Sequence, residues 1–232
     1  APTSSASTSS SSTTATIATT TTTESIEVCE PEAIEGRGRI WEAGCSYTAS
    51  SFLVPITFAG EDGWTSLGGG NEWVALKHDA NGDGDADVTL TVFAHNEDSA
   101  PGVILDEILS FDGVTAVSDE AAMELAGASA LTVDVVAEEK IPVQSDSDGC
   151  TQPSGTAFFF QTTPGYVLFQ LPAGPGPGSF GIPACYQSRV WVFEVEGFTI
   201  TAIGVTPTVE AFDEYMPILE DFLQNSMKFG EG

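Results

Sequence analysis

An acidic stretch near the middle of the chain, HDANGDGDADV (residues 78–88), has the residue types and spacing of a cation site. Oxygen-bearing side chains stand at every second position: Asp79, Asn81, Asp83, Asp85 and Asp87. Hard oxygen ligands at alternate positions let a short backbone wrap one Ca²⁺ ion, and a glycine at position 84 supplies the sharp bend. The pattern predicts a structural Ca²⁺ site with the weak affinity of extracellular modules, about 10⁻⁴–10⁻³ M.

Two features separate this stretch from an EF-hand. Position twelve of the loop is Leu90 instead of a bidentate glutamate, and the flanking residues have strand patterns instead of helical ones. The alternative is an exposed hairpin loop, because Asn81-Gly82 and Asp83-Gly84 are both turn-forming pairs. A simple turn needs only one such pair, however, and closely spaced carboxylates repel one another unless a cation neutralises them. Both interpretations stand at this stage, and neither defines a function.

The other candidate motifs predict no catalytic residue. If residues 72–78 pair with residues 87–95 across the acidic loop, His78 faces Asp87 and His95 lies about 25 Å away at ~3.4 Å per residue. We therefore expect no shared metal site, and we expect His78 to be a surface side chain. The GPGSFG stretch (176–181) matches GxGxxG only formally, since no strand–turn–helix unit surrounds it. A secreted hydrolase that uses a pair of carboxylates is a further hypothesis, but the sequence singles out no acidic residues for that role.

Four cysteines indicate the compartment. Their spacing contains no CxxC pair, and an even count in an acidic chain with a Ser/Thr-rich beginning favours disulfides and an oxidising environment. Sequence alone allows three connectivities, of which we favour the local one, Cys29 with Cys45 and Cys150 with Cys185. The alternative is four free thiols in a cytosolic protein. The four tryptophans fit core or rim packing better than a carbohydrate-binding face.

The elements that position these residues follow from periodicity. Short β-branched runs bounded by turn residues predict strands over 52–58, 72–78, 87–94, 130–137, 156–161 and 166–171, and two more over 188–205 that reverse at Glu196-Gly197. Helical spacing predicts a short helix over 101–111 and a longer one from Thr206-Pro207 to Ser226. The fold class is therefore α+β: a mainly antiparallel β-sheet packed against a C-terminal helix and one shorter helix.

The stretch GCSYTASSFLVPITFAGEDGW (44–64) resembles the opening of a family of uncharacterised bacterial secreted or lipoprotein domains. The matching positions are Gly44, Tyr47, Phe52, Pro55, Phe58, Gly63 and Trp64. The resemblance covers roughly residues 40–229 and extends to the PsbP-like α+β sandwich. It implies a binding or structural scaffold and carries no catalytic residues. The acidic loop and the N-terminal segment lie outside the family pattern.

Composition divides the chain at residue 24 and restricts its partners. Residues 1–24 form a Ser/Thr-rich arm or stalk whose first 23 residues carry no charge, and residues 25–232 form the domain. With 34 Asp and Glu against 6 Lys and Arg, the net charge of −28 disfavours nucleic acid and anionic membranes. No apolar run reaches the ~20 residues of a membrane span. We expect Ala1 to follow a removed signal peptide or a lipidated cysteine upstream.

The N-terminal segment suggests how the protein works. An uncharged Ser/Thr tract is typical of a flexible, O-glycosylated stalk, but the β-branched run Thr19, Thr20, Thr21, Thr22 and Thr23 favours an extended strand. Our first hypothesis is a non-catalytic extracellular subunit of a filament or layer, in which this extended arm pairs with a sheet edge of another copy. The alternative is a monomeric surface-anchored binding module on a stalk.

Overall fold

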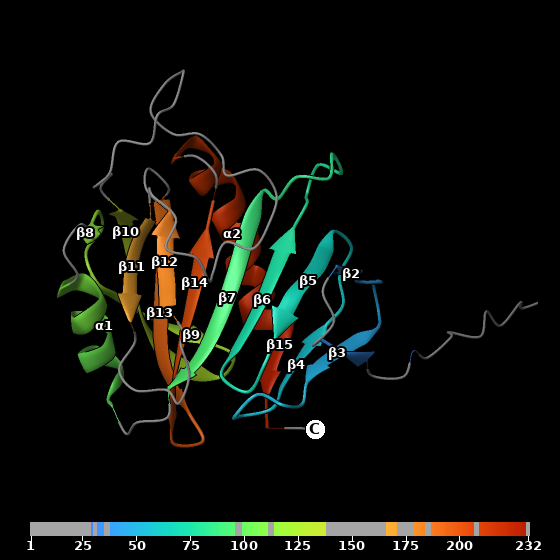
Figure 1. Cartoon of the computed structure of the whole chain (residues 1–232), viewed down its shortest axis with the longest axis horizontal. Helices are drawn as coiled ribbons and strands as arrows, with labels where there is room; N and C mark the ends of the chain where they lie inside the picture. The colour runs from blue at the N-terminus through green and yellow to red at the C-terminus, as the bar shows by residue number, and fades with distance from the viewer. Residues whose placement is uncertain are drawn as a thin grey trace, which may run out of the picture.

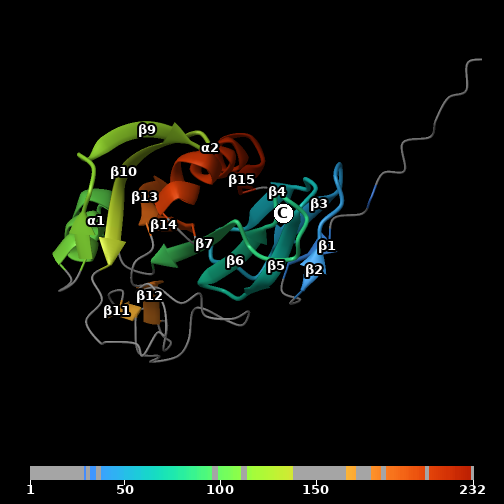
Figure 2. The same cartoon turned by 90° about the horizontal axis from the view of Figure 1, so that it is seen from above.

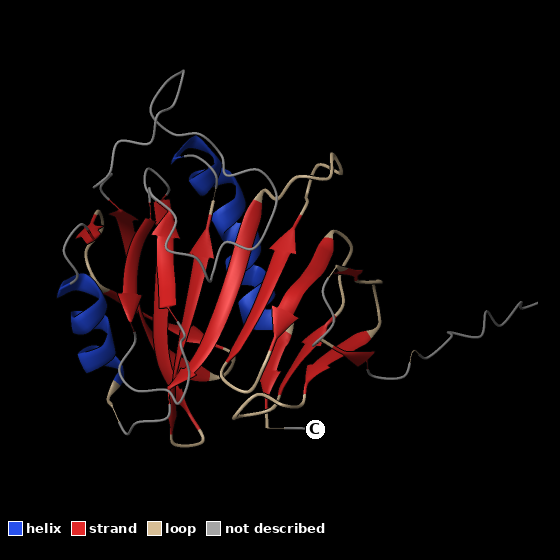
Figure 3. Cartoon of the chain, in the orientation of Figure 1, coloured by secondary structure: helices blue, strands red, loops and turns tan. Residues whose placement is uncertain are grey.

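The computed structural model describes residue 29 and residues 32–34, 38–95, 99–110, 114–137, 166–170, 179–183, 187–206 and 209–230. These residues form strands and two helices, so the predicted α+β class is confirmed (Figures 1 and 3). The Ser/Thr-rich segment, including Thr19–Thr23, lies outside the described residues.

A main sheet of nine strands forms the body of the protein. Its order is β2-β5-β6-β7-β14-β13-β10-β8, with β9 also paired to β10, and its described pairings are antiparallel. The strands in chain order are β2 (Arg39–Ile40), β5 (Trp64–Gly69), β6 (Trp73–His78), β7 (Val88–His95), β8 (Val114–Ala116), β9 (Ala121–Leu125), β10 (Ala128–Ala137), β13 (Gln187–Val195) and β14 (Phe198–Val205).

Two smaller sheets accompany the main sheet. The first contains β1 (Glu32–Ala33), β3 (Ser46–Ala49), β4 (Ile56–Ala59) and β15 (Met227–Phe229), in the order β1-β3-β4-β15. Its β1–β3 pairing is parallel. The second pairs β11 (Tyr166–Gln170) with β12 (Ser179–Pro183), and it lies on the side of the main sheet opposite the C-terminal helix (Figures 1 and 2).

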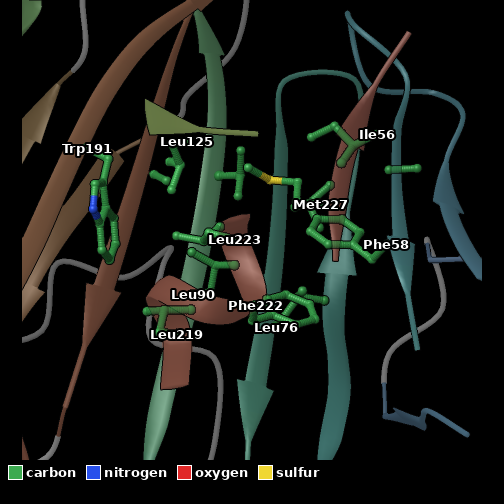
Figure 4. Packing of buried hydrophobic residues seen from close by; sticks show 14 of the residues in the cluster. Ile56, Phe58, Leu76, Leu90, Leu125, Trp191, Leu219, Phe222, Leu223 and Met227 are labelled. Carbon is green, nitrogen blue, oxygen red and sulfur yellow. The ribbon is translucent and has the colours of Figure 1, made fainter. Parts of the chain in front are cut away.

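The C-terminal helix α2 (Val209–Asn225) packs its apolar face into the core. The predicted stripe of apolar residues also includes Tyr215, which is only partly buried. Its other members are buried: Phe212, Met216, Leu219, Phe222 and Leu223. Figure 4 shows three of these side chains packed among Leu76 of β6, Leu90 of β7 and residues of β4 and β15. Gly204 of β14 permits this approach, because a Cβ there would lie 2.3 Å from Leu219 Cδ2. The helix therefore covers one face of the sheet, as predicted.

The main sheet is buried on both faces near β13. Trp191 and Phe193 of β13 belong to the cluster under α2, while their neighbours Val190 and Val192 pack in a second cluster with α1 (Pro101–Ser110). Side chains on a strand alternate between faces, so this consecutive apolar run needs a partner on each side. The helix α1 supplies Ile104, Leu105 and Ile108 to the second cluster.

Local predictions were confirmed at most hairpins and corrected at one strand. The two-residue turn predicted at Glu196-Gly197 joins β13 and β14, and both residues have positive φ (52° and 83°), as in a type I′ turn. The strand predicted over 52–58 begins only at Ile56. The preceding residues bend instead: Phe52 N bonds Ala49 O at 3.3 Å, and Pro55 has no N–H to offer a ladder. The strand predicted over 156–161 lies outside the described residues.

Candidate functional site

The acidic loop sits at the tip of the hairpin formed by β6 and β7. His78 pairs with Val88, one residue beyond the predicted partner Asp87, and Asp87 N donates to His78 O at 2.9 Å. The predicted position of the loop between two strands is therefore confirmed. Residues 80–85 are exposed, whereas Asp87 at the base of the loop is only 9% exposed.

Asp79 folds the first half of the loop around its carboxylate. Its Oδ1 accepts a hydrogen bond from Gly82 N at 2.6 Å, and its Oδ2 accepts one from Gly84 N at 2.8 Å. Both glycines have positive φ, 75° and 96°, which is costly for residues with a side chain. The glycines of the two Asx-Gly pairs are thus both used in turning the backbone.

The other predicted ligands also accept backbone hydrogen bonds. Asn81 Oδ1 accepts from Asp83 N, and Asp83 Oδ1 accepts from Asp85 N, both at 2.9 Å. Asp87 accepts from Ala80 N at 2.8 Å and from Asn81 Nδ2 at 3.2 Å. N–H donors stabilise the charged form of a carboxylate, so the backbone itself offsets part of the repulsion inside the loop.

These side chains do not converge on one point in the present conformation. Among the described His, Cys, Asp and Glu residues, Cys29, Glu42 and Cys45 form the one group of three whose ligand atoms lie within 4.8 Å of one another. Two of those three are joined as a disulfide, so this group is no metal site. Ca²⁺ binding by Asp79, Asn81, Asp83, Asp85 and Asp87 stays a prediction, and it requires the free carboxylate oxygens to turn inward.

The helix α2 holds the base of the loop through Tyr215, whose contact with the loop was not predicted from the sequence. Tyr215 hydrogen-bonds with Asp87 and Asn81. The pKa of Tyr215 is raised above its ordinary value, first by desolvation and then by the negative charges of Asp87 and Glu214. Lys77 adds a bond from its Nζ to Gly84 O at 3.0 Å. The loop is therefore fixed to both the sheet and the helix.

His78 corrects one prediction about the surface. The side chain was expected to be exposed, but it is 8% exposed and its ring lies 4.9 Å from that of Trp64, its cross-strand partner. Gly63 makes room for it, since a Cβ there would come within 2.9 Å of His78 Nε2.

His95 lies at the far end of β7, as predicted. Its Nε2 is 2.8 Å from Thr201 Oγ1, and its burial lowers its pKa to about 4. The two histidines thus occupy opposite ends of one strand pair and belong to separate environments. The tryptophans also follow the packing interpretation, because Trp41, Trp64 and Trp191 are buried and Trp73 packs against the second cluster.

The disulfide predicted between Cys29 and Cys45 is present, with a Cα–Cα distance of 5.2 Å. Cys45 is buried directly before β3, and Cys29 precedes β1, which runs parallel to β3. The bond therefore anchors the first part of the domain, five residues after the N-terminal segment, to β3. Cys150 and Cys185 lie outside the described residues, so their pairing stays a prediction.

Comparisons with known proteins give little about function. No family model and no curated protein matches the chain. A solved structure from Bacteroides thetaiotaomicron has a TM-score of 0.38 and 9% identity, covering 85% of this chain and 49% of that one. The solution structure of PsbP from Synechocystis sp. PCC 6803 has the same TM-score and identity, covering 79% and 91%. The expected likeness to PsbP is met only weakly, and similarity of this degree carries no argument about activity.

Neither helix in the described part of the chain is long and apolar enough to cross a membrane.

Proposed function

We propose that the protein is a non-catalytic extracellular subunit that assembles with copies of itself, with residues 1–24 as the connecting arm. The Cys29–Cys45 disulfide is the observation that carries this proposal. It anchors the chain covalently at Cys29, five residues after the Ser/Thr-rich segment ends. A disulfide also supports an oxidising compartment outside the cytosol.

A covalent tether matters because β1 alone is a weak anchor. Only Glu32 and Ala33 of β1 pair with β3, followed by one more bond from Ile34 N to Thr48 O at 3.1 Å. Backbone hydrogen bonds contribute about 1 kcal/mol each, so tension on an arm bound to another copy would unpair this short strand. With the disulfide in place, the pull passes to the buried Cys45 and then to β3 and the core.

The positions of the two histidines are compatible with the proposed scaffold role. His78 and His95 are the only histidines in the chain, and both are buried, so neither is presented to a substrate as a general base. The charge distribution favours other copies of the protein as partners. The net charge of −28 opposes binding to nucleic acid and anionic lipid. The first 23 residues carry no charge, so they can approach another acidic domain without electrostatic repulsion.

Deletion of residues 1–23 tests the proposal. We expect the truncated protein to remain folded and soluble, because the disulfide and β1 are retained, and to lose assembly in sedimentation velocity and negative-stain microscopy. A variant in which Thr19–Thr23 are replaced by Gly/Ser residues is the matched control for length, and it should also lose assembly because glycine disfavours strand pairing. Unchanged assembly of the truncated protein would contradict the proposal.

The alternative is a monomeric surface-bound binding module on a flexible stalk, with a lipid anchor upstream of Ala1. The same disulfide would serve a stalk equally well, and an uncharged Ser/Thr tract is typical of one. In that case the intact protein stays monomeric at every concentration, which the same sedimentation experiment detects.

We further propose that the acidic loop binds Ca²⁺ as a structural clip. For a dissociation constant of 10⁻⁴–10⁻³ M, about 5 mM Ca²⁺ should stabilise the fold by about 1–2 kcal/mol, because the ion binds only the folded loop. A rise in the melting temperature would report this gain. The double substitution Asp83→Ala with Asp85→Ala should abolish it.

The control for the loop substitutions is Asp106→Ala with Asp119→Ala, which removes the same charge at exposed positions outside the loop. This control should retain the Ca²⁺-dependent gain. Asp83 Oδ1 also accepts a hydrogen bond from Asp85 N, so the substitution can lower the melting temperature even without Ca²⁺. The quantity to compare between the variants is therefore the rise in melting temperature on adding Ca²⁺. Equal gains in both double variants would assign the effect to general screening of the acidic surface.

A further inference from the structure

The strand β9 presents an outer edge of the main sheet. It forms a hairpin with β10 through Ala126 and Gly127, whose φ values of 48° and 81° are those of a two-residue type I′ turn. Such a turn makes the flanking pair, Leu125 with Ala128, a hydrogen-bonded pair, and the pattern then alternates along the hairpin. The N–H and C=O groups of Ala122 and Glu124 therefore point away from β10.

This edge is longer than the others of the main sheet. The opposite end of the sheet is β2, which pairs over two residues, and there a register shift in β5 between Ser66 and Gly68 disrupts the edge. The neighbouring β8 has three residues. In contrast, β9 has five, and β10 is its only strand partner among the described residues. Ala121, Ala122 and Glu124 are exposed, and two of these side chains are small.

The N-terminal arm leaves from the other end of the molecule. Figures 1 and 2 place β1, β2 and β3 at one end, and α1, β8 and β9 toward the opposite end. Five residues separate Thr23 from the tethered Cys29, so Thr23 lies within about 20 Å of it even when fully extended. Thr19, ten residues before Cys29, lies within about 36 Å of it when fully extended, so the Thr19–Thr23 run can reach a neighbouring molecule whose β9 end abuts the β1 end.

The chemistry of the two surfaces is compatible. Most of the acidic chain would be repelled by Glu124 and its surroundings, but residues 1–23 carry no charge. Threonine favours extended strands, and its hydroxyl can donate a hydrogen bond to the Glu124 carboxylate. The small side chains of Ala121 and Ala122 leave room for a β-branched neighbour across the strand pair.

We infer that the outer edge of β9, at Ala122 and Glu124, accepts the Thr19–Thr23 segment of a second copy as an added strand. This inference rests on the proposed function and names the surface that receives the arm. Because the arm and its acceptor lie at opposite ends, each copy both donates and accepts, and a contact that does not close into a ring extends into a fibre.

Ala122→Pro in the full-length protein tests the acceptor edge. Proline removes only the outward N–H at this position and is tolerated on edge strands, so the hairpin with β10 should persist. We expect the variant to be folded by circular dichroism and to need at least a tenfold higher concentration to assemble in sedimentation velocity. Folded Ala122→Pro that assembles like the intact chain would overturn the inference.

Ala116→Pro is the matched control on the adjacent β8. Val117 N donates to Asp134 O at 2.8 Å and Ala116 pairs with Val135, so the N–H of Ala116 also points outward. This variant should assemble normally. If loss occurs with Ala116→Pro instead, β8 is the acceptor and the β9 assignment is wrong.

A photo-crosslinking amino acid at position 122 keeps the test decisive if the proline variant does not fold. In a mixture of isotopically labelled and unlabelled protein, it should crosslink between copies to the tryptic peptide of residues 1–37, and the same group at position 116 should not. Absence of that crosslink in assembled material would also overturn the inference. Assembly after deletion of residues 1–23 would instead refute the proposed function itself, so the two failures are distinguishable.

Discussion

The substitution Arg189→Met should lower the free energy of unfolding by about 3 kcal/mol, because it leaves a partly buried carboxylate without its cation. Arg189 Nε lies 2.5 Å from Asp134 Oδ1 and Nη2 lies 2.8 Å from Oδ2, a bidentate pair between directly opposed residues of β13 and β10. Nη1 reaches Glu220 Oε1 of α2 at 2.7 Å. One guanidinium therefore joins two strands and a helix.

Because of its burial and its acidic surroundings, this ion pair should contribute more to the free energy of unfolding than an ordinary surface pair does. The side chains of Arg189 and Asp134 are 22% and 13% exposed, so solvent screens them only in part. The guanidinium also lies over the Phe212 ring, 5.2 Å from its centroid, and it is one of only six Lys and Arg in the chain. Its loss leaves two acidic groups facing each other without the cation between them.

Urea denaturation at neutral pH measures the effect, with Arg189→Lys and the double variant Arg189→Met with Asp134→Leu as controls. Lysine keeps the charge but loses the bidentate geometry, so an intermediate loss is expected. The double variant should recover much of the stability, because replacing both partners leaves no unpaired charge in that strand pair. A loss below about 0.5 kcal/mol in the single variant would show that the pair behaves as a solvated surface contact.

Much of the fold was predictable because local and global signals agree in its central hairpin. The run from Ser188 to Val205 is mostly apolar and β-branched, and Glu196-Gly197 is its turn-forming pair, so the strand pairing and its turn followed from sequence. The stripe of α2 was predictable for a similar reason: its apolar residues repeat at helical spacing across Pro217, which lies on the exposed side.

Other elements depend on long-range contacts that no local pattern encodes. The strand β9 has the sequence AAMEL, which has neither alternation nor β-branching, and its pairing with β10 is determined by the turn at Ala126-Gly127. The strands β1 and β2 have two residues each and exist because β3 and β5 offer them partners. Periodicity cannot identify elements of this length.

The acidic loop shows a similar division between local and long-range information. Alternating oxygen ligands and Asx-Gly turns were visible in sequence, and the structure places them in one hairpin loop. Sequence did not indicate that Tyr215, more than 120 residues away, would bind Asp87, or that His78 would be buried against Trp64. Those contacts depend on how α2 and β5 pack, which is a property of the assembled core.

Lowering the pH from 7 to 4 should destabilise the protein through His95, by up to about 3 kcal/mol from this residue alone. The ring is 4% exposed, and burial lowers its pKa from 6.5 to about 4. The unfolded chain therefore takes up a proton at this site as the pH falls through 6.5, whereas the folded protein resists protonation until the pH nears 4. The stability contributed by neutral His95 is complete above pH 6.5 and is lost between these two values.

The variant His95→Gln isolates this effect from the many carboxylates that titrate in a similar range. Glutamine is uncharged at every pH and can still hydrogen-bond to Thr201, while the acidic residues are common to both proteins, so their contributions cancel in the difference. Urea denaturation at several pH values should show the stability of the variant rising relative to that of the wild type by about 3 kcal/mol between pH 7 and pH 4. Parallel stability curves for the two proteins would show that His95 is protonated in the folded state at its ordinary pKa, and that its ring reaches solvent despite its position between β7 and β14.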